Sequence, residues 1–493
     1  MSNSVGATRA DLSFGTKLAY GVGSIAYGAK LQVLGLMLFY YNQMQGLPAH
    51  LVSGVLSAAI IIDAIWDPLV GVVSDNTRTP WGRRHPFMYA AALPVALCVI
   101  FMLNPPAGLS HGALLAFAAA MAIGARMMIS LYEIPNTALA AELAPGYDQR
   151  TSLMSWRYFF QAIGHAIALL LAGFVFLRPH GGLSGQFNKA GYGPLALTIG
   201  VIMFVSILAS SLGTHRQIGN LSAPRRRKFT ISELLWGFLL TIRNPNLLAL
   251  SISGMLFGFM TGLAQGLTFY FHTYLWGLSA ALIAVVGASG LIGAVPAAVL
   301  APLLARRYGK KPVCMSLFFL SILALAAPFV AKLAGVMPPP GSKPLVALLM
   351  VDQAMVSALS MMGFIIVSSM IADIVEEIEL ATGQRSEGLL FAMDTFLQKV
   401  TTGVSASLPG LLLLWVGLPV GARPQTLDPR IMIHLVQIYL PTVLALCLCS
   451  VTCIAFYRID RARHEGNLRR IADAATIAET AQEAFHQPLD PAA

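Results

Sequence analysis

The sequence contains few charged residues: of its 493 residues only 11% are Asp, Glu, Lys or Arg, whereas 56% are hydrophobic. Soluble proteins carry about 25% charged residues, so the composition excludes a soluble globular protein. The 32 Lys and Arg residues exceed the 22 Asp and Glu residues, and the formal net charge is +10. With so few charges in total, this surplus favours loops beside a membrane over a nucleic-acid surface, and we expect no nucleic-acid partner.

Cysteine is also scarce, and the common catalytic motifs are missing. The five cysteines lie in apolar stretches without metal-ligand spacing, and their odd number argues against a disulfide framework. The chain has no GxSxG elbow, no HExxH, no Walker loop and no Cys/His cluster. We therefore expect neither an enzyme nor a cofactor, and the missing phosphate-binding loop argues against direct use of ATP.

Long apolar runs, in contrast, are abundant. About 20 mainly apolar residues are needed for a helix to cross the hydrocarbon core of a bilayer. The runs predict an all-α membrane protein with twelve transmembrane helices. We place these helices at residues 18–44, 50–74, 86–104, 112–141, 152–177, 191–213, 246–274, 280–304, 312–335, 344–375, 388–416 and 430–456.

Most Lys and Arg residues outside these runs fall on the side of the amino terminus, which the positive-inside rule assigns to the cytoplasm. We expect a protein of the plasma (inner) membrane with both termini cytoplasmic. The basic segment APRRRKFT lies almost halfway along the chain, and TPWGRRHP and RRYGKKP each follow the second span of one half. This repeat predicts two pseudo-symmetric six-helix bundles, the build of major facilitator transporters. The expected parts are an N-terminal bundle (1–214), a cytoplasmic linker (215–245), a C-terminal bundle (246–457) and a cytoplasmic tail (458–493).

Two aspartates stand inside the second predicted span. Asp63 and Asp67, in DAIWDP, are four residues apart and therefore share one helix face. Two neighbouring carboxylates at membrane depth must share a proton or hold a cation, and hard oxygen ligands suit Na⁺ or H⁺. We predict a cation site here, which is a metal site if the ion is Na⁺. Asp67 also begins a pattern with Asp75, Arg83 and Arg84 that is typical of a gate, and helix pairing remains an alternative for both aspartates.

A third acidic residue, Glu133, lies in the fourth span beside Pro135, which removes a helical hydrogen bond and frees a backbone carbonyl. Together with the hydroxyl of Ser130, this carboxylate has the chemistry of a shared cation and substrate site. The alternative is a structural pair with Arg157 or Arg126.

Few basic residues lie inside the predicted spans. Lys399 falls near the middle of the eleventh span, and its simplest partner is the acidic cluster of the first half, although a local pair with Asp394 is the alternative. Lys30 is a weaker candidate for a polar cavity, and Tyr27 is one of several aromatic residues suited to line it. On the tenth span, Asp373 lies near the cytoplasmic end, where a gating role is expected.

The sequence resembles the glycoside-pentoside-hexuronide cation symporters of the melibiose permease type. The resemblance rests on KLAYGVGSIAYG, DAIWDPLVG followed by GRRHP, YEIPNTALAAEL, RYFF, and MIADIVEEIELATGQRSEG before Lys399. It implies that Asp63, Asp67 and Glu133 bind the coupling cation, with Ser130 at a hydroxyl position. It also implies that Arg157 and Lys399 serve substrate binding and coupling.

Three positions depart from the melibiose-type pattern. Gly28 stands where such members have a sugar-binding aspartate, Thr137 stands where they have a tryptophan that stacks on the sugar, and Trp66 replaces an asparagine. The resemblance thus implies that the cation-binding residues are retained and that the residues that bind a galactoside are not. We expect Thr137 to face the substrate instead.

Three functions follow from these observations. The first is symport, by alternating access, of a small organic solute such as a glycoside, sugar or sugar acid, driven by Na⁺ or H⁺. The second is cation-coupled transport of an amphiphile such as a lysophospholipid, and the third is a non-transporting membrane sensor on a transporter scaffold. The expected partners are a small-molecule substrate and the lipid bilayer, and we expect a monomer.

Overall fold

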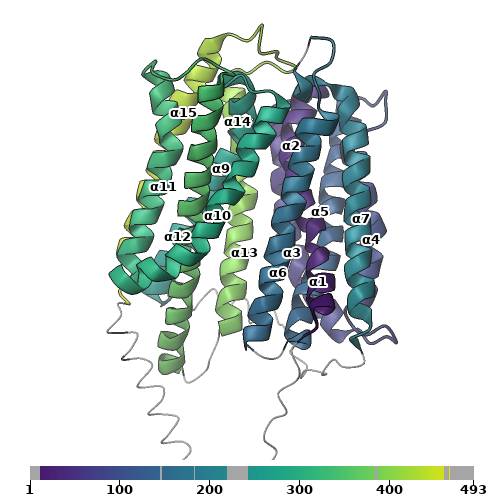
Figure 1. The fold of residues 1–493 in the computed structure, drawn as a ribbon, viewed down its shortest axis with the longest axis vertical. Coiled ribbons are helices and arrows are strands. Elements are labelled where there is room, and N and C mark those ends of the chain that lie inside the picture. The colour runs from purple at the N-terminus through teal and green to yellow at the C-terminus, as the bar shows by residue number, and fades with distance from the viewer. Residues whose placement is uncertain are drawn as a thin grey trace, which may run out of the picture.

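The computed structural model describes residues 12–144, 147–182, 184–218, 243–382 and 387–459, together with residues 463 and 466. Most of the predicted linker (215–245) and of the predicted tail (458–493) lies outside these residues. Every regular element longer than a single turn in the described part of the chain is a helix. Figure 1 shows the purple-to-blue helices of the first half beside the green-to-yellow helices of the second half.

The first half is built from helices that follow the predicted spans. In chain order they are α1 (Phe14–Val22), α2 (Ser24–Phe39), the π-helix η1 (Tyr40–Met44), α3 (Ala49–Asn76), α4 (His85–Met102), α5 (His111–Leu143), α6 (Tyr147–Leu170), the π-helix η2 (Leu171–Phe176), the short 3₁₀ turns η3 (Gly185–Phe187) and η4 (Lys189–Gly191), and α7 (Tyr192–His215).

The second half repeats this order. Its helices are α9 (Pro245–Tyr270), the π-helix η6 (Phe271–Leu275), α10 (Ala280–Tyr308), α11 (Lys310–Leu333), α12 (Lys343–Thr382), α13 (Glu387–Ser405), α14 (Leu408–Trp415) and α15 (Pro429–Ala455).

Polar side chains mark where several helices begin. The hydroxyl of Ser110 accepts a hydrogen bond from the backbone N–H of Ala113 at the start of α5, and Ser279 caps α10 in the same way. Asn244 caps α9 and Asp428 caps α15, each followed by a proline at the first helical turn. The caps satisfy N–H groups that have no partner within the helix, so the loop residues themselves set where these spans start.

Helix packing repeats between the two halves. In the first half α5 packs on α3 and α4, α6 packs on α2, and α7 packs on α4. In the second half α12 packs on α10 and α11, α13 packs on α9, and α15 packs on α11. The same helix pairs therefore form twice, as expected for two pseudo-symmetric bundles of the major facilitator fold.

Glycine allows the closest of these contacts. A Cβ added to Gly28 of α2 would lie 1.9 Å from the carbonyl oxygen of Gln161 on α6. A Cβ added to Gly164 of α6 would lie 2.2 Å from the carbonyl oxygen of Ile25. Small residues let helix backbones approach in a bilayer, where lipid chains compete with apolar side chains. Gly28 therefore faces α6, which explains why this position carries no sugar-binding side chain.

Eleven helices of the described chain are long and apolar enough to cross a membrane. The prediction of a single helix over residues 388–416 is wrong, because α13 ends at Ser405 and α14 begins at Leu408. Pro409 has no N–H to donate to the carbonyl of Ser405, which weakens the helix where it is interrupted. Together α13 and α14 supply the remaining span. The first span is also interrupted, at Gly23 between α1 and α2.

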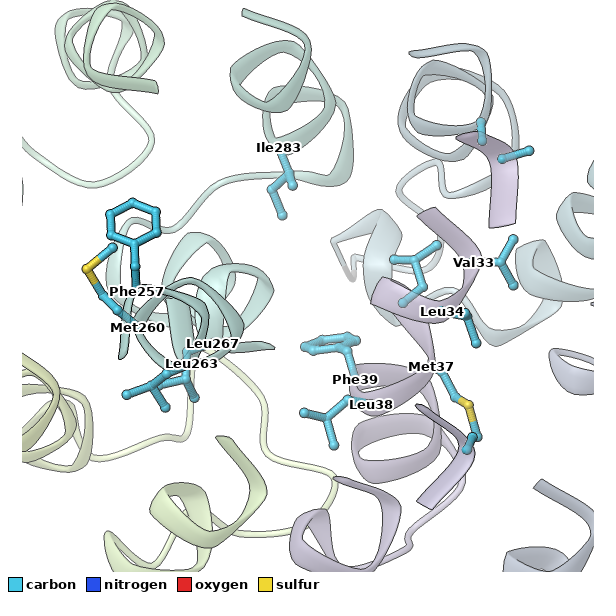
Figure 2. Close-up of a cluster of buried hydrophobic side chains, with 14 of the residues drawn as sticks. Val33, Leu34, Met37, Leu38, Phe39, Phe257, Met260, Leu263, Leu267 and Ile283 are labelled. Carbon is cyan, nitrogen blue, oxygen red and sulfur yellow. The ribbon is translucent and has the colours of Figure 1, made fainter. Parts of the chain in front are cut away.

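The two bundles meet at the end of the molecule where α2 ends and α3 begins. Hydrogen bonds join Tyr270 Oη to Asn42 Oδ1 (3.0 Å), Tyr274 Oη to Gln43 Oε1 (3.0 Å) and Ser53 Oγ to the carbonyl of Ser407 (3.1 Å). Apolar side chains of α2 and α9 pack beside them (Figure 2). This junction lies on the side that the charge distribution predicts to be extracellular.

Candidate functional site

The acidic pair of the second span meets Lys399 across the boundary between the bundles. The ammonium of Lys399, on α13, lies 3.2 Å from Asp63 Oδ2 and also pairs with Asp67 Oδ2. Asp63 is only 4% exposed, and both aspartates lie on the face of α3 that packs against α13. The predicted partnership between Lys399 and the first-half acids is confirmed. The side chain of Asp394, the alternative partner, lies outside the described residues.

Two residues of α5 complete the surroundings of Asp63. Ser130 Oγ donates to Asp63 Oδ1 at 2.8 Å, and Arg126 Nη1 lies 3.8 Å from Asp63 Oδ2. Asp67 Oδ1, in contrast, is buried and has no hydrogen-bond partner among the described residues. A buried carboxylate oxygen without a donor is costly, so this atom is suited to receive a proton or a cation.

Trp66 connects the same two helices. Its indole N–H donates to the carbonyl of Met127 at 3.0 Å, which anchors α3 on α5 between the two aspartates. Trp66, which departs from the melibiose-type pattern, therefore makes a structural contact within the first bundle.

Glu133 is paired within the first bundle, as the alternative prediction stated. Arg157 Nη2, on α6, lies 2.6 Å from Glu133 Oε1, and Arg157 Nη1 donates to Thr137 Oγ1. Thr137 Oγ1 in turn donates to the carbonyl of Glu133 at 2.7 Å. The three side chains form one network, in which the Arg157 side chain is only 12% exposed. Substrate binding by Glu133, Arg157 and Thr137 stays a prediction, and a substrate would meet them as a unit.

Lys30 and Tyr27 form the remaining part of the site on α2. Lys30 is 4% exposed, and its ammonium lies 4.0 Å from the centroid of the Tyr27 ring. A buried ammonium over an aromatic face gains a cation–π attraction, which replaces part of its lost hydration. Lys30 also interacts electrostatically with Glu133 and Asp63. Lys30, a weaker candidate from the sequence, therefore lies beside the other charged groups of the site, and its role stays a prediction.

The predicted gating residues of the first half form a tight ion-pair cluster. Arg84 pairs with Asp75, and its Nε lies 3.1 Å from Glu142 Oε1. Arg83 Nη2 lies 2.7 Å from the same oxygen. Glu142, at the end of α5, is a residue that sequence reasoning missed. It is 8% exposed and contacts both arginines. The sequence signal for such a residue was the pair Arg83 and Arg84, because the single carboxylate of Asp75 cannot balance two guanidinium groups.

The second half has a corresponding but smaller cluster. Lys310 Nζ contacts both carboxylate oxygens of Asp373, at 2.6 and 2.7 Å. Tyr457 donates to Asp373 Oδ2 at 3.4 Å, and burial followed by the charge of Asp373 raises the pKa of this hydroxyl above its usual range, so it stays a donor. The pairing partners predicted for Asp75 and the arginines are thus present, while their role as gates stays a prediction.

Two repeated helical bundles with charged side chains joined at membrane depth define a multi-pass membrane transporter of the major facilitator type, which is not an enzyme. The chain belongs to the family described as MFS/sugar transport protein, whose model matches residues 19–461. The resemblance to sugar and cation symporters is confirmed at this level.

Individual relatives agree with this assignment. The chain is 24% identical to the isoprimeverose transporter of Lactiplantibacillus pentosus over 432 residues, which cover 86% of this chain and 84% of that protein. It is 33% identical to an uncharacterized symporter of Synechocystis over 218 residues, which cover 43% of this chain and 39% of that protein. It is 23% identical to the inner membrane symporter YicJ of Escherichia coli, covering 84% of this chain and 85% of that protein.

Solved structures support the fold. A nucleoside transporter, NupG, superposes with a TM-score of 0.62 at 14% identity, covering 90% of this chain and 98% of that chain. A D-xylose-proton symporter gives a TM-score of 0.61 at 14% identity, covering 89% of this chain and 97% of that chain.

Proposed function

We propose that this protein is a secondary active transporter that couples Na⁺ or H⁺ to the symport of a small glycoside, sugar or sugar acid by alternating access. The observation that carries the proposal is the ammonium of Lys399 in the second bundle, which pairs with Asp63 and Asp67 of the first bundle. An ion pair that crosses the boundary between two moving bodies links the charge state of the site to their relative position.

Coupling follows from competition for the two carboxylates. A proton or Na⁺ that binds at Asp67 Oδ1 and Asp63, with Ser130 as a neighbouring hydroxyl, neutralises one of the two negative charges that hold Lys399. Lys399 is then held less tightly and can turn into the space between the bundles, where its side chain is already 31% exposed. Because the released ammonium attracts negative charge, cation binding raises the affinity for an anionic solute, and the reverse holds by linkage.

The charge balance of the site favours a sugar acid among these substrates. Its carboxylates are Asp63, Asp67 and Glu133, and its cationic groups are Lys30, Arg126, Arg157 and Lys399. With all groups ionised the cationic groups exceed the carboxylates by one, before any coupling ion binds. The surplus becomes two when the coupling cation is bound, and a solute that carries one carboxylate lowers it to one, whereas a neutral sugar leaves it unchanged.

Access to the site is proposed to alternate between the two ends of the molecule. The hydrogen bonds of Asn42, Gln43 and Ser53 hold the bundles together at one end. At the opposite end, the ion pairs of Glu142 and Asp373 brace helices within each bundle, so each bundle is suited to move as a rigid body. We place the protein in the inner membrane as a monomer, with both termini cytoplasmic and Asp75, Arg83, Arg84 and Asp373 as parts of the gates.

Transport by purified protein in liposomes tests the proposal. A matched pair of solutes, phenyl glucuronide and phenyl glucoside, differs only in the carboxylate of the sugar ring. We expect the glucuronide to accumulate under an inward Na⁺ gradient or an inward proton gradient, and the glucoside to accumulate less. Separate application of the two gradients identifies the ion. Accumulation of a lysophospholipid instead would favour the amphiphile alternative, and saturable binding without flux would favour a sensor.

The variant Asp63→Asn distinguishes ion-driven accumulation of the solute from its passive movement through the transporter. It keeps the size of the side chain and loses the charge, so we expect uptake down a solute gradient to persist while ion-driven accumulation disappears. Asp352→Asn, which removes another carboxylate within a span, is the matched control and should transport as the unmodified protein does. Equal ion-driven accumulation by both variants would contradict the proposed role of Asp63.

A further inference from the structure

A hollow lined by several basic side chains lies away from the carboxylate cluster of Asp63 and Asp67, where α10 ends, α11 begins and α15 ends. Its volume is about 1240 Å³. We call this hollow the basic pocket, because several of its lining residues are basic. These are Arg306, Arg307, Lys310, Lys311 and Arg458. The acidic residue of the wall is Asp373, which leaves the pocket with a large positive surplus.

Most of this positive charge is not balanced. Lys310 is neutralised by Asp373, with both contacts shorter than 3 Å. Lys311 donates to the carbonyl of Ala455 at 2.6 Å, which orients its ammonium but carries no formal charge. Among the described residues, no carboxylate lies within ion-pair distance of Arg306, Arg307, Lys311 or Arg458. Like charges gathered in one hollow repel one another, so the arrangement is suited to an anion.

The internal repeat shows that this surplus is particular to the second half. In the first half Asp75 precedes Gly82 and pairs with Arg84, whereas Pro302 stands the same distance before Gly309 and lines the basic pocket. One of the two carboxylates that balance the first cluster is therefore replaced by an uncharged residue. The second half adds two arginines, Arg306 and Arg307, at positions where the first half has Thr79 and Pro80.

Exposed apolar residues are direct sequence neighbours of residues that line the basic pocket. Leu303 follows Pro302 on α10 and is 55% exposed, and Phe456 follows the end of α15 and is 64% exposed. Tyr308, which lines the pocket, is 58% exposed. Exposed apolar residues on a membrane span face lipid chains, and aromatic residues gather where the hydrocarbon meets the headgroups. The pocket thus lies at headgroup level, beside a surface suited to acyl chains.

We propose that the basic pocket binds the phosphate of an anionic phospholipid. Arginine guanidinium groups bind phosphate oxygens through two parallel hydrogen bonds, and Arg306 and Arg307 supply such groups while Lys311 and Arg458 add charge. The lipid chains lie against Leu303 and Phe456. A lipid is favoured over free phosphate because the site joins a cationic hollow to an exposed apolar surface, which matches an amphiphile.

Lipid titration of the purified full-length protein tests this inference. The protein is delipidated in detergent, and its melting temperature is followed as dioleoyl phosphatidylglycerol is added in mixed micelles. Dioleoyl phosphatidylcholine has the same chains without net charge, and inorganic phosphate has the charge without chains. We expect stabilisation by phosphatidylglycerol at much lower concentrations than by phosphatidylcholine, and none by inorganic phosphate.

Charge-removing variants locate the site. Arg306→Gln/Arg307→Gln should need about 30-fold more phosphatidylglycerol for half-maximal stabilisation, because each basic residue at a membrane surface contributes about a fivefold effect. Arg458→Gln, on a different segment, should shift the midpoint about fivefold and remains informative if the double variant folds poorly. The matched control is Arg78→Gln/Arg216→Gln, two exposed arginines at the same end of the other bundle. Equal midpoints in variant and control, or equal protection by inorganic phosphate, would overturn the proposal.

Discussion

Replacing Lys399 by glutamine should make the protein bind its coupling cation more tightly. The substitution removes the ammonium that pairs with Asp63 and Asp67 and leaves two carboxylates one helical turn apart. Removing one partner of a buried ion pair costs about 3–5 kcal/mol. The Lys399 side chain is 31% exposed, so water screens part of this energy and we expect about 2 kcal/mol. A proton or Na⁺ recovers that energy, which corresponds to about 30-fold tighter binding.

The measurement is a thermal-stability titration of the purified variant with Na⁺ at fixed pH, and with pH in the absence of Na⁺. Lys399→Gln should melt at a lower temperature than the unmodified protein without cation and should be stabilised at a lower cation concentration. Lys343→Gln, which removes an exposed ammonium at the start of α12, is the control and should leave the midpoint unchanged. An unchanged or higher midpoint in Lys399→Gln would refute competition between the ammonium and the cation.

Three other substitutions test separate parts of the structure. Gly28→Ala brings a methyl group against the Gln161 carbonyl and should lower the melting temperature by an amount equivalent to about 1–3 kcal/mol, whereas Gly35→Ala, with nothing within 4 Å, should not. Glu142→Gln leaves Arg83 without a carboxylate partner and Arg84 with Asp75 alone, and should cost about 3 kcal/mol in chemical denaturation; an unchanged midpoint would show the cluster to be unimportant for stability. Arg157→Gln should abolish glucuronide uptake and Arg157→Lys should retain part of it, whereas equal loss in both would indicate a purely structural role.

Much of the fold could be predicted because a bilayer restricts what a chain can do. Apolar runs of the right length must become helices, since backbone groups have no water to bind in hydrocarbon. The division of the span at 388–416 could not be located in the same way. Proline occurs inside α3, α5 and α10 without ending those helices, so the presence of Pro409 alone did not predict a break. At the interruption, the carbonyl of Ser407 accepts a hydrogen bond from Ser53 of α3 at 3.1 Å, a tertiary contact that the sequence does not show.

The residues of the candidate site could be predicted where a charge lies at membrane depth, since burying it costs free energy. They could not be predicted at helix ends, where a charged residue is common. Asp63, Asp67 and Lys399 stand out because each would cost several kcal/mol alone at membrane depth, and each therefore needs a partner. Glu142 lies at the end of a helix, where an acid is ordinary, and only the contact with two arginines shows its importance. The choice between Arg157 and Arg126 as the partner of Glu133 stayed open, because a sequence does not show which way a long side chain turns.

The junction between the bundles has an electrical consequence. Its hydrogen bonds, those of Asn42, Gln43 and Ser53, join uncharged groups, so breaking them separates no charge. A charged contact between the bundles at this end is that of Arg423, whose guanidinium lies 4.7 Å from the centroid of the Phe187 ring. The transmembrane voltage can act on the proposed cycle only through charges that move at membrane depth, at about 2.3 kcal/mol per elementary charge and 100 mV. At the proposed site, the charges that enter, leave or are released during the cycle are the coupling ion, the solute and the ammonium of Lys399. The membrane potential would then drive the filling of the site, while the hydrogen bonds of the junction break without separating charge.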